Sequence, residues 1–300
     1  MVRRAAPKGH GPLVIRIVRP EEPPGALARK GSTLVRDMLA EYHADPRSYQ
    51  DGSKAFEFDQ GVYGHRDVKK CLSKAQHDKC AYCEVRVVSD AGDVEHFRPK
   101  AGVRQGKDQR KQSPGYFWLA YTWSNLLYAC SRCNREHKRD LFPLEDPTAR
   151  ADALREEGST AGEAPLLLDP TTDTPELHIR FNGERAEPLN EGRRGRVTID
   201  VLGLNRTSLL EARRERLEHV RQRVHTLRLV RAGIVPMNHP EAREHLHDLC
   251  RELLAATESR APFAAMIRGA VRQWLAPDLE FPCSEERLVA WALPHADLAG

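Results

Sequence analysis

The sequence lacks an apolar run that approaches the length of a membrane span, and its Met-Val-Arg-Arg start lacks the apolar segment of a signal peptide. We therefore expect a cytoplasmic protein that does not enter a membrane. The sequence also lacks a Gly-rich phosphate-binding loop that ends in Lys-Ser or Lys-Thr, so we expect nucleotide sensing to lie in another chain. The net charge of +4 is too small to indicate a nucleic-acid partner by itself.

Cysteine is also scarce, but its placement is informative. Among the 7 cysteines are two Cys-x-x-Cys pairs, Cys80/Cys83 and Cys130/Cys133. Two turns of this spacing can supply the four thiolates of a tetrahedral zinc site. Thiolates favour zinc over magnesium or calcium, and a site closed by four protein ligands has no open position for catalysis. The spacing therefore predicts a structural Zn²⁺ ion.

A dithiol redox site and a pair of disulfides are the alternative uses of such cysteines. A redox site needs only one pair, so two pairs favour the metal. The odd number of cysteines, with two pairs of metal-binding type, fits a reducing cytoplasm better than secretion. We expect Cys71, Cys250 and Cys283 to be ordinary buried thiols.

Between the two cysteine pairs lies a cluster of polar residues that can do chemistry. Glu95 and His96 lie in a short segment, residues 94–97, whose alternation of apolar and polar residues indicates a strand or turn. Asn125 precedes the second cysteine pair, and Asn134 follows it directly. An acid beside a histidine is common on surfaces, but a zinc turn on each side would allow these four side chains to converge.

These motifs resemble the HNH, or ββα-metal, endonucleases. The sequences Cys80-Ala-Tyr-Cys-Glu84, Val94-Glu-His-Phe-Arg-Pro-Lys100 and Leu141-Phe-Pro143 are similar to the HNH subunits of Septu-type anti-phage systems, called PtuB, and to HNH proteins found beside retrons. The resemblance extends through Phe117-Trp-Leu-Ala-Tyr-Thr-Trp-Ser-Asn-Leu-Leu127, Leu166-Leu-Leu-Asp-Pro170 and Leu202-Gly-Leu-Asn-Arg206. It therefore covers most of residues 65–225.

The resemblance implies a role for each polar residue of the cluster. His96 would be the general base that activates water, because imidazole titrates near neutral pH. Glu95 and Asn134 would bind a catalytic Mg²⁺ or Mn²⁺ ion, since such an ion commonly takes only one or two protein oxygen ligands. Asn125 would brace the loop that orients His96, or would simply form a turn before a buried strand.

Several cations could contact the phosphates of a nucleic acid. If an α-helix runs through Asn134, His137 and Lys138, the three share a face. His137 could then compete with Asn134 as a metal ligand, and Lys138 could contact phosphate or be an ordinary solvated lysine. We also expect Arg98, Lys100 and His137 to contact nucleic acid. The basic segment 100–111 is either a solvated loop or an arm that follows phosphates.

The pattern of the chain predicts a mainly helical α+β protein. A ββα-metal (HNH) core stapled by the four-cysteine zinc site would lie between an N-terminal arm and a helical C-terminal region. We expect a division into residues 1–64, 65–145, 146–206 and 207–300. The expected elements are strands at 13–19 and 166–168, a hairpin that begins at 178–183, and helices at 27–42, 65–79, 208–227, 241–257 and 262–275. The helix from residue 208 has an apolar stripe, with Arg213 among the arginines elsewhere around it.

The resemblance also implies a partner, an ABC-type ATPase like PtuA, which we expect to bind the N-terminal arm or the C-terminal helices. The predicted substrate is DNA, with RNA as a further possibility because the site recognises a phosphodiester. Two other functions remain open: a stand-alone HNH restriction-type DNA nuclease, and a zinc-stabilised module that binds nucleic acid or protein without catalysis.

Overall fold

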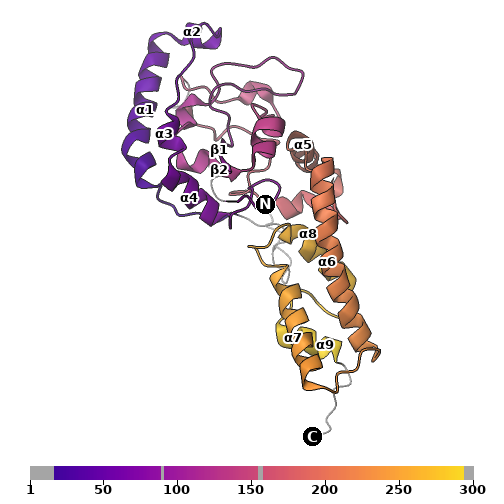
Figure 1. Cartoon of the computed structure of the whole chain (residues 1–300). Helices are drawn as coiled ribbons and strands as arrows, with labels where there is room; N and C mark the ends of the chain where they lie inside the picture. The colour runs from indigo at the N-terminus through magenta and orange to yellow at the C-terminus, as the bar shows by residue number, and fades with distance from the viewer. Residues whose placement is uncertain (1–16, 89–90, 155–157, 294–300) are drawn as a thin grey trace, which may run out of the picture. The chain divides into compact units, whose positions relative to one another are not determined.

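A computed structural model describes residues 17–88, 91–154 and 158–293, and the described chain divides into two compact units (Figure 1). The core unit comprises residues 17–178 and 188–204, and the helical unit comprises Ile179–Glu187 and residues 205–293. Within these described ranges, no helix is both long enough and apolar enough to cross a membrane. The protein is therefore a mixture of helices and small two-stranded sheets.

The core unit contains five α-helices and one antiparallel strand pair among its described residues. They are α1 (Gly25–Ala44), α2 (Pro46–Gln50), α3 (Gln60–Tyr63), α4 (Arg66–Ala75), β1 (Asp93–His96), β2 (Leu126–Ala129) and α5 (Arg193–Val201). The helices predicted at 27–42 and 65–79 are confirmed. The segment between them contains the short helices α2 and α3, at whose starts Asp45 and Asp59 each accept a hydrogen bond from a backbone N–H of the helix that follows.

β1 and β2 form the centre of the core unit. Glu95 pairs with Leu127 and His96 with Leu126 in an antiparallel register, which confirms the predicted strand at residues 94–97. The free edge of β2 is closed by the buried side chain of Gln76, which donates a hydrogen bond to the Tyr128 carbonyl (2.7 Å) and accepts one from the Tyr128 N–H (2.9 Å). The C-terminal end of α4 is thereby fixed to the strand that precedes the second cysteine pair.

The aromatic block at residues 116–128 packs into the core. Tyr116, Phe117 and Tyr128 are almost completely buried. The ring of Phe117 stacks on Phe56 at 4.3 Å and meets the edge of Tyr42 at 5.0 Å, so the block holds α1 against the strand pair. No side chain of this buried group is available as a platform for nucleic-acid bases.

Three predictions about the core unit are wrong or incomplete. Residues 166–168 are buried but do not form a strand, since the chain bends there and Leu166 hydrogen-bonds only to the Pro143 carbonyl. Residues 17–19 of the predicted edge strand are irregular, and residues 13–16 lie outside the described chain. Cys71 is only half-buried, and so is Cys283 of the helical unit.

The helical unit confirms the predicted hairpin and helices and adds one helix. Its elements are β3 (Ile179–Asn182), β4 (Arg185–Pro188), α6 (Thr207–Arg231), α7 (Pro240–Ala255), α8 (Ala264–Leu275) and α9 (Glu285–Ala292). Gly183 turns the hairpin with a φ of +56°, a conformation that glycine adopts without strain. The additional helix α9 starts where Ser284 accepts a hydrogen bond from the Arg287 N–H (3.3 Å).

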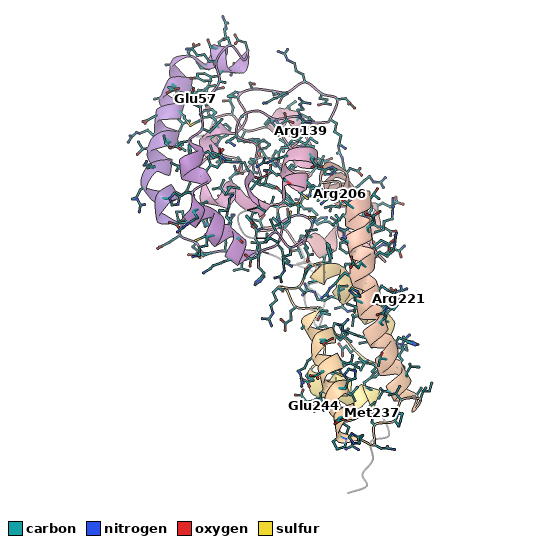
Figure 2. All side chains as sticks on the ribbon, in the orientation of Figure 1. Glu57, Arg139, Arg206, Arg221, Met237 and Glu244 are labelled. Carbon is teal, nitrogen blue, oxygen red and sulfur yellow. The ribbon has the colours of Figure 1, made fainter. Side chains whose placement is uncertain are left out.

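The apolar stripe of α6 is confirmed, with one correction. Leu217, Val220 and Val224 are buried, whereas Arg221 lies on the exposed face (Figure 2). Arg213 was predicted to lie away from the buried face, but only 2% of it is exposed. Its guanidinium lies 4.9 Å from the Phe181 ring and donates a hydrogen bond to the Glu184 carbonyl, so the β3–β4 hairpin provides the partners that permit its burial.

Candidate functional site

The four cysteines of the two pairs converge on one point, as their spacing predicts. Their sulfur atoms lie within 4.8 Å of one another, and the Sγ atoms of Cys83 and Cys130 are 3.8 Å apart. Zinc–sulfur bonds of about 2.3 Å in a tetrahedron would separate neighbouring sulfurs by about 3.8 Å. Burial raises the pKa of the Cys80 thiol, whereas hydrogen bonds from neighbouring thiols lower the pKa of Cys130. The donor set and its dimensions therefore fit a zinc ion.

A polar pocket of 290 Å³ lies beside the strand pair. Glu95, His96, Lys100 and Asn134 all line it, and so does Asp93. Thus three of the four residues with predicted catalytic roles meet in one cavity. Asn125 and the fully buried Lys138 do not line this pocket, and neither does His137.

The imidazole of His96 is held in one tautomer. Its Nε2 lies 2.9 Å from the carbonyl oxygen of Ala120, which can only accept a hydrogen bond, so Nε2 carries the proton. Nδ1 is then left with a lone pair. Only 6% of His96 is exposed, and burial, supported by the nearby Lys100 charge, lowers its pKa to about 3. His96 is therefore a neutral imidazole at physiological pH, and contrary to the expectation from the sequence it does not titrate near neutral pH.

Glu95 is held by Lys138, which is fully buried. The ammonium lies 2.6 Å from Oε1 of Glu95 and donates a hydrogen bond to the His96 carbonyl (2.9 Å). Burial raises the pKa of the Glu95 carboxyl, while the Lys138 charge acts in the opposite direction. Lys138 is thus not the solvated lysine of the alternative interpretation. Its side chain has no exposed surface in this structure. Its contact with phosphate stays a prediction.

The segment after Cys133 is wound as a π-helix, Arg132–Lys138, and this changes which side chains share a face. A residue advances roughly 82° around a π-helix instead of 100° around an α-helix. His137, three residues after Asn134, is therefore turned roughly 110° away from it, whereas Lys138 stays within roughly 30°. The ring of His137 packs against Gly203, where a Cβ atom would approach it to 2.4 Å.

Asn134 faces β1 from this helix. Its Nδ2 donates a hydrogen bond to Oδ2 of Asp93 (3.1 Å), so its Oδ1 remains available as an acceptor. Asp93 also forms an ion pair with Arg135. Asp93 was not among the predicted site residues, although it lies two positions before Glu95 on the strand and its carboxylate is of the same chemical type.

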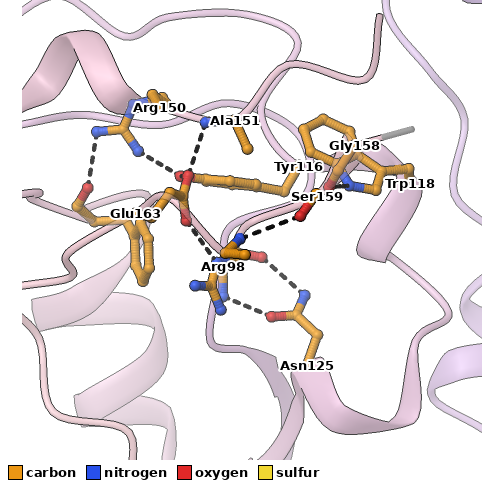
Figure 3. A network of polar contacts seen from close by, with 11 residues as sticks. Arg98, Tyr116, Trp118, Asn125, Arg150, Ala151, Gly158, Ser159 and Glu163 are labelled. Carbon is orange, nitrogen blue, oxygen red and sulfur yellow. Dashed lines mark hydrogen bonds and ion pairs between the residues drawn. The ribbon is translucent and has the colours of Figure 1, made fainter. Parts of the chain in front are cut away.

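Asn125 braces the loop that follows His96. Its Oδ1 accepts a hydrogen bond from the Arg98 N–H (2.8 Å), and its Nδ2 donates to the carbonyls of Arg98 (3.0 Å) and Leu119 (3.1 Å). These bonds connect the end of β1 to the aromatic block, and Figure 3 shows those between Asn125 and Arg98. The aromatic block also carries the Ala120 carbonyl that orients His96. The geometry is that expected for a bracing residue.

One substitution at residue 125, with a control at its neighbour, separates the bracing role from turn formation. Asn125→Asp keeps a turn-forming residue but removes both donated hydrogen bonds. We expect the free energy of unfolding to fall by about 2–4 kcal/mol, since each lost bond contributes about 1 kcal/mol and carbonyl groups are left unpaired. Chemical denaturation would measure this, with Ser124→Ala at the exposed neighbour as the control. If Asn125→Asp left the free energy of unfolding unchanged, residue 125 would be only a turn-former.

Arg98 lies in a buried polar network. Its Nε lies 2.9 Å from Oε2 of Glu163, whose side chain is only 1% exposed (Figure 3). The other carboxylate oxygen of Glu163 accepts hydrogen bonds from the Tyr116 hydroxyl (2.5 Å) and the Ala151 N–H (2.9 Å). The guanidinium also lies 5.3 Å from the Phe142 ring. These contacts show that Arg98 helps to hold the core unit together. Its contact with nucleic acid stays a prediction.

Lys100 reaches the pocket from the loop after β1. Its Nζ lies 3.4 Å from Nδ1 of His96 and 4.6 Å from the centre of the Tyr63 ring. Burial lowers the pKa of this ammonium, and the Glu95 charge acts in the opposite direction. Lys107 and Arg110, farther along the same basic segment, are exposed and lie outside the pocket lining.

Arg139 also lines the pocket, and the sequence did not single it out (Figure 2). It ends the π-helix with φ 51° and ψ −117°, a conformation that is unfavourable for a residue with a side chain. Its side chain is exposed and makes no ion pair with any described residue. The sequence contains many arginines and no pattern distinguishes this one, so its place in the pocket lining could be found only from the structure.

The pocket suits a hard divalent cation better than zinc. Its candidate ligands are the carboxylate of Glu95 and the amide oxygen of Asn134, and oxygen donors are what magnesium prefers. Among the described residues, the cysteine cluster is the only group of three or more histidine, cysteine or acidic side chains with metal-binding geometry. A magnesium or manganese ion fits this sparse donor set, because it keeps several water ligands.

Comparisons with known proteins agree with the motifs. The chain is 40% identical over 163 residues to the "Septu protein PtuB" of Bacillus mycoides (strain KBAB4), a match that covers 54% of each protein. It is 26% identical over 167 residues to the "Retron Vc95 putative HNH endonuclease" of Vibrio cholerae serotype O1 biovar El Tor, which covers 54% of this chain and 67% of that protein. These similarities confirm the resemblance to PtuB and to retron HNH proteins.

A third relative has a different name. The chain is 31% identical over 146 residues to the "Septu protein PtuA" of the same Bacillus mycoides strain, covering 49% of this chain and 20% of that protein. The chain spans about half the length of the PtuB protein of that strain. No family model matches the chain. No solved structure matches it.

Proposed function

We propose that this protein is a metal-dependent HNH endonuclease that hydrolyses phosphodiester bonds of nucleic acid and serves as the effector nuclease of an anti-phage defence system. The observation that carries the proposal is the neutral imidazole of His96, with its Nε2 proton held by the Ala120 carbonyl, in a pocket that Glu95 and Asn134 also line. The PtuB and retron relatives support the same reaction class.

His96 acts through Nδ1. A water molecule beside Nδ1 loses a proton to it as the water oxygen attacks the phosphorus atom. The Ala120 carbonyl then stabilises the imidazolium that forms, because it already accepts the Nε2–H hydrogen bond. Lys138 holds the His96 carbonyl and Asn125 holds the Arg98 N–H, so the backbone at and just after His96 is fixed and the ring needs no rearrangement before reaction.

The catalytic ion would be held by Glu95 and Asn134. When bound, Mg²⁺ or Mn²⁺ would supply positive charge to the non-bridging and leaving oxygens of the phosphate. Lys138 limits the freedom of the carboxylate, since it holds Oε1 of Glu95 and leaves Oε2 for another partner. The zinc ion of the cysteine cluster would keep the strand pair and the π-helix together.

The proposed partner is an ABC-type ATPase like PtuA. The Septu names of two relatives support this partner, and so does the lack of a Lys-Ser/Thr phosphate-binding loop in this chain. The PtuA protein carries a segment similar to this chain in one fifth of its length, so such a segment can be part of a much longer Septu protein.

A nuclease assay tests the function and the partner together. The purified chain is incubated with duplex DNA and with RNA in Mg²⁺ or Mn²⁺, alone and with the co-expressed ATPase. We expect metal-dependent cleavage of at least one nucleic acid, with more cleavage in the complex. Equal cleavage of DNA by the chain alone would favour a stand-alone restriction-type nuclease. No cleavage under any of these conditions would contradict the enzyme assignment and favour a binding module.

A further inference from the structure

The ammonium group of Lys100 lies against the Nδ1 lone pair of His96, which the proposed reaction needs. Nε2 of His96 carries the ring proton because it faces a carbonyl oxygen, so Nδ1 is the only ring nitrogen that can accept one. The Nζ atom of Lys100 lies 3.4 Å from this Nδ1. An ammonium group has donors and no acceptor, so the contact must be Lys100 donating to His96.

Lys100 has no carboxylate partner that would hold it in this place. Its Nζ rests against the rings of Tyr63 (4.6 Å) and Phe58 (5.3 Å), and no acidic group of the described residues lies within ion-pair distance. This differs from Lys138 and Arg135, whose charges are matched by Glu95 and Asp93. Lys100 is therefore a partly buried cation at the pocket wall that can still gain an anionic partner.

A phosphate group is a much better partner for an ammonium than a neutral imidazole or an aromatic ring, because the hydrogen bond then joins two opposite charges. A phosphodiester that enters the pocket would draw the Lys100 ammonium away from Nδ1. The Nδ1 lone pair would then be free for a water molecule. The stem of Lys100 has the length and the rotatable bonds for this movement.

We propose that Lys100 is a catalytic residue that binds the phosphate entering the pocket and thereby uncovers Nδ1 of His96. This inference rests on the proposed nuclease function and adds to it a base that is blocked until substrate arrives. No covalent step is involved, since the ammonium exchanges one hydrogen-bond acceptor for another. The same contact places a positive charge on the phosphate, where negative charge increases during the attack of water.

The first test measures binding rather than cleavage. Lys100→Met keeps a long unbranched side chain but removes the charge that lies over the rings of Tyr63 and Phe58. Affinities for a duplex DNA and for a single-stranded RNA are measured at several salt concentrations, with Ca²⁺ in place of Mg²⁺ to prevent cleavage. We expect the slope of log affinity against log salt concentration to decrease by about one in Lys100→Met. Lys74→Met, which removes an exposed charge of α4 outside both the pocket lining and the basic segment 100–111, is the matched control.

The second test measures turnover on a saturating substrate. We expect Lys100→Met to lower kcat by about 10²-fold, the effect of removing one electrostatic contact to the transition state, and Lys100→Arg to restore most of it. Zinc content and the melting temperature show whether each variant is folded. If the wild-type protein cleaves nothing but Lys100→Met still shows the reduced salt slope, the nuclease function is rejected and the phosphate site at Lys100 is kept. An unchanged slope, an unchanged or higher kcat, or no binding by the wild-type protein would overturn the proposal.

Discussion

Removing the ion from the four-cysteine cluster is expected to unfold the region around β1 and β2. The sulfurs belong to two turns that are far apart in the sequence, at Cys80–Cys83 and at Cys130–Cys133, yet all four lie within 4.8 Å of one another. Structural zinc sites contribute on the order of 10 kcal/mol to folding, which is as large as the total stability of many domains. A titration with a zinc chelator, monitored by circular dichroism and by tryptophan fluorescence, would measure this loss.

The matched control for zinc removal is a cysteine outside the cluster. We expect Cys133→Ser to lose both the bound zinc and the cooperative melting transition of the core unit. Cys71→Ser changes a half-buried thiol of α4 and should retain both. Native mass spectrometry gives the metal content of each variant. A protein that contains no zinc when purified under reducing conditions, yet melts cooperatively, would contradict the structural zinc site.

Replacing His96 by alanine is expected to abolish cleavage while the protein stays folded. General-base catalysis contributes about 10²- to 10⁴-fold to the rate, and the second nitrogen of this ring is already used for orientation. Loss of the buried ring should also lower the melting temperature slightly. The rate of cleavage, the zinc content and the melting temperature are measured on the same preparation, because only the first should change greatly.

His137→Ala is the control for this experiment, since it removes an imidazole that lies outside the pocket lining. We expect it to retain most of the cleavage activity, even if the lost packing against Gly203 reduces stability. If His137→Ala were as inactive as His96→Ala, His137 would belong to the site after all. If neither substitution affected cleavage, the base would have to be another residue.

Local patterns in the chain predicted those parts of the site that depend only on neighbours in sequence. The spacing of Cys80/Cys83 and Cys130/Cys133 predicted their convergence, because a tight turn of two residues already directs both thiolates to one point. The alternation at residues 94–97 indicated a strand or turn, which is β1, and the hairpin expected to begin at 178–183 is the β3–β4 pair. The resemblance drawn from these motifs agrees with the similarity to PtuB proteins.

Only the tertiary structure decided which partner each charged side chain has. Lys138 could have been an ordinary solvated lysine but is buried against Glu95, and the π-helical winding turns His137 away from Asn134. The sequence contains the side chains, yet their burial and partners depend on segments that are far apart in the chain. The cost of burying a charge is offset only when such a partner arrives, and that is decided when the whole core packs.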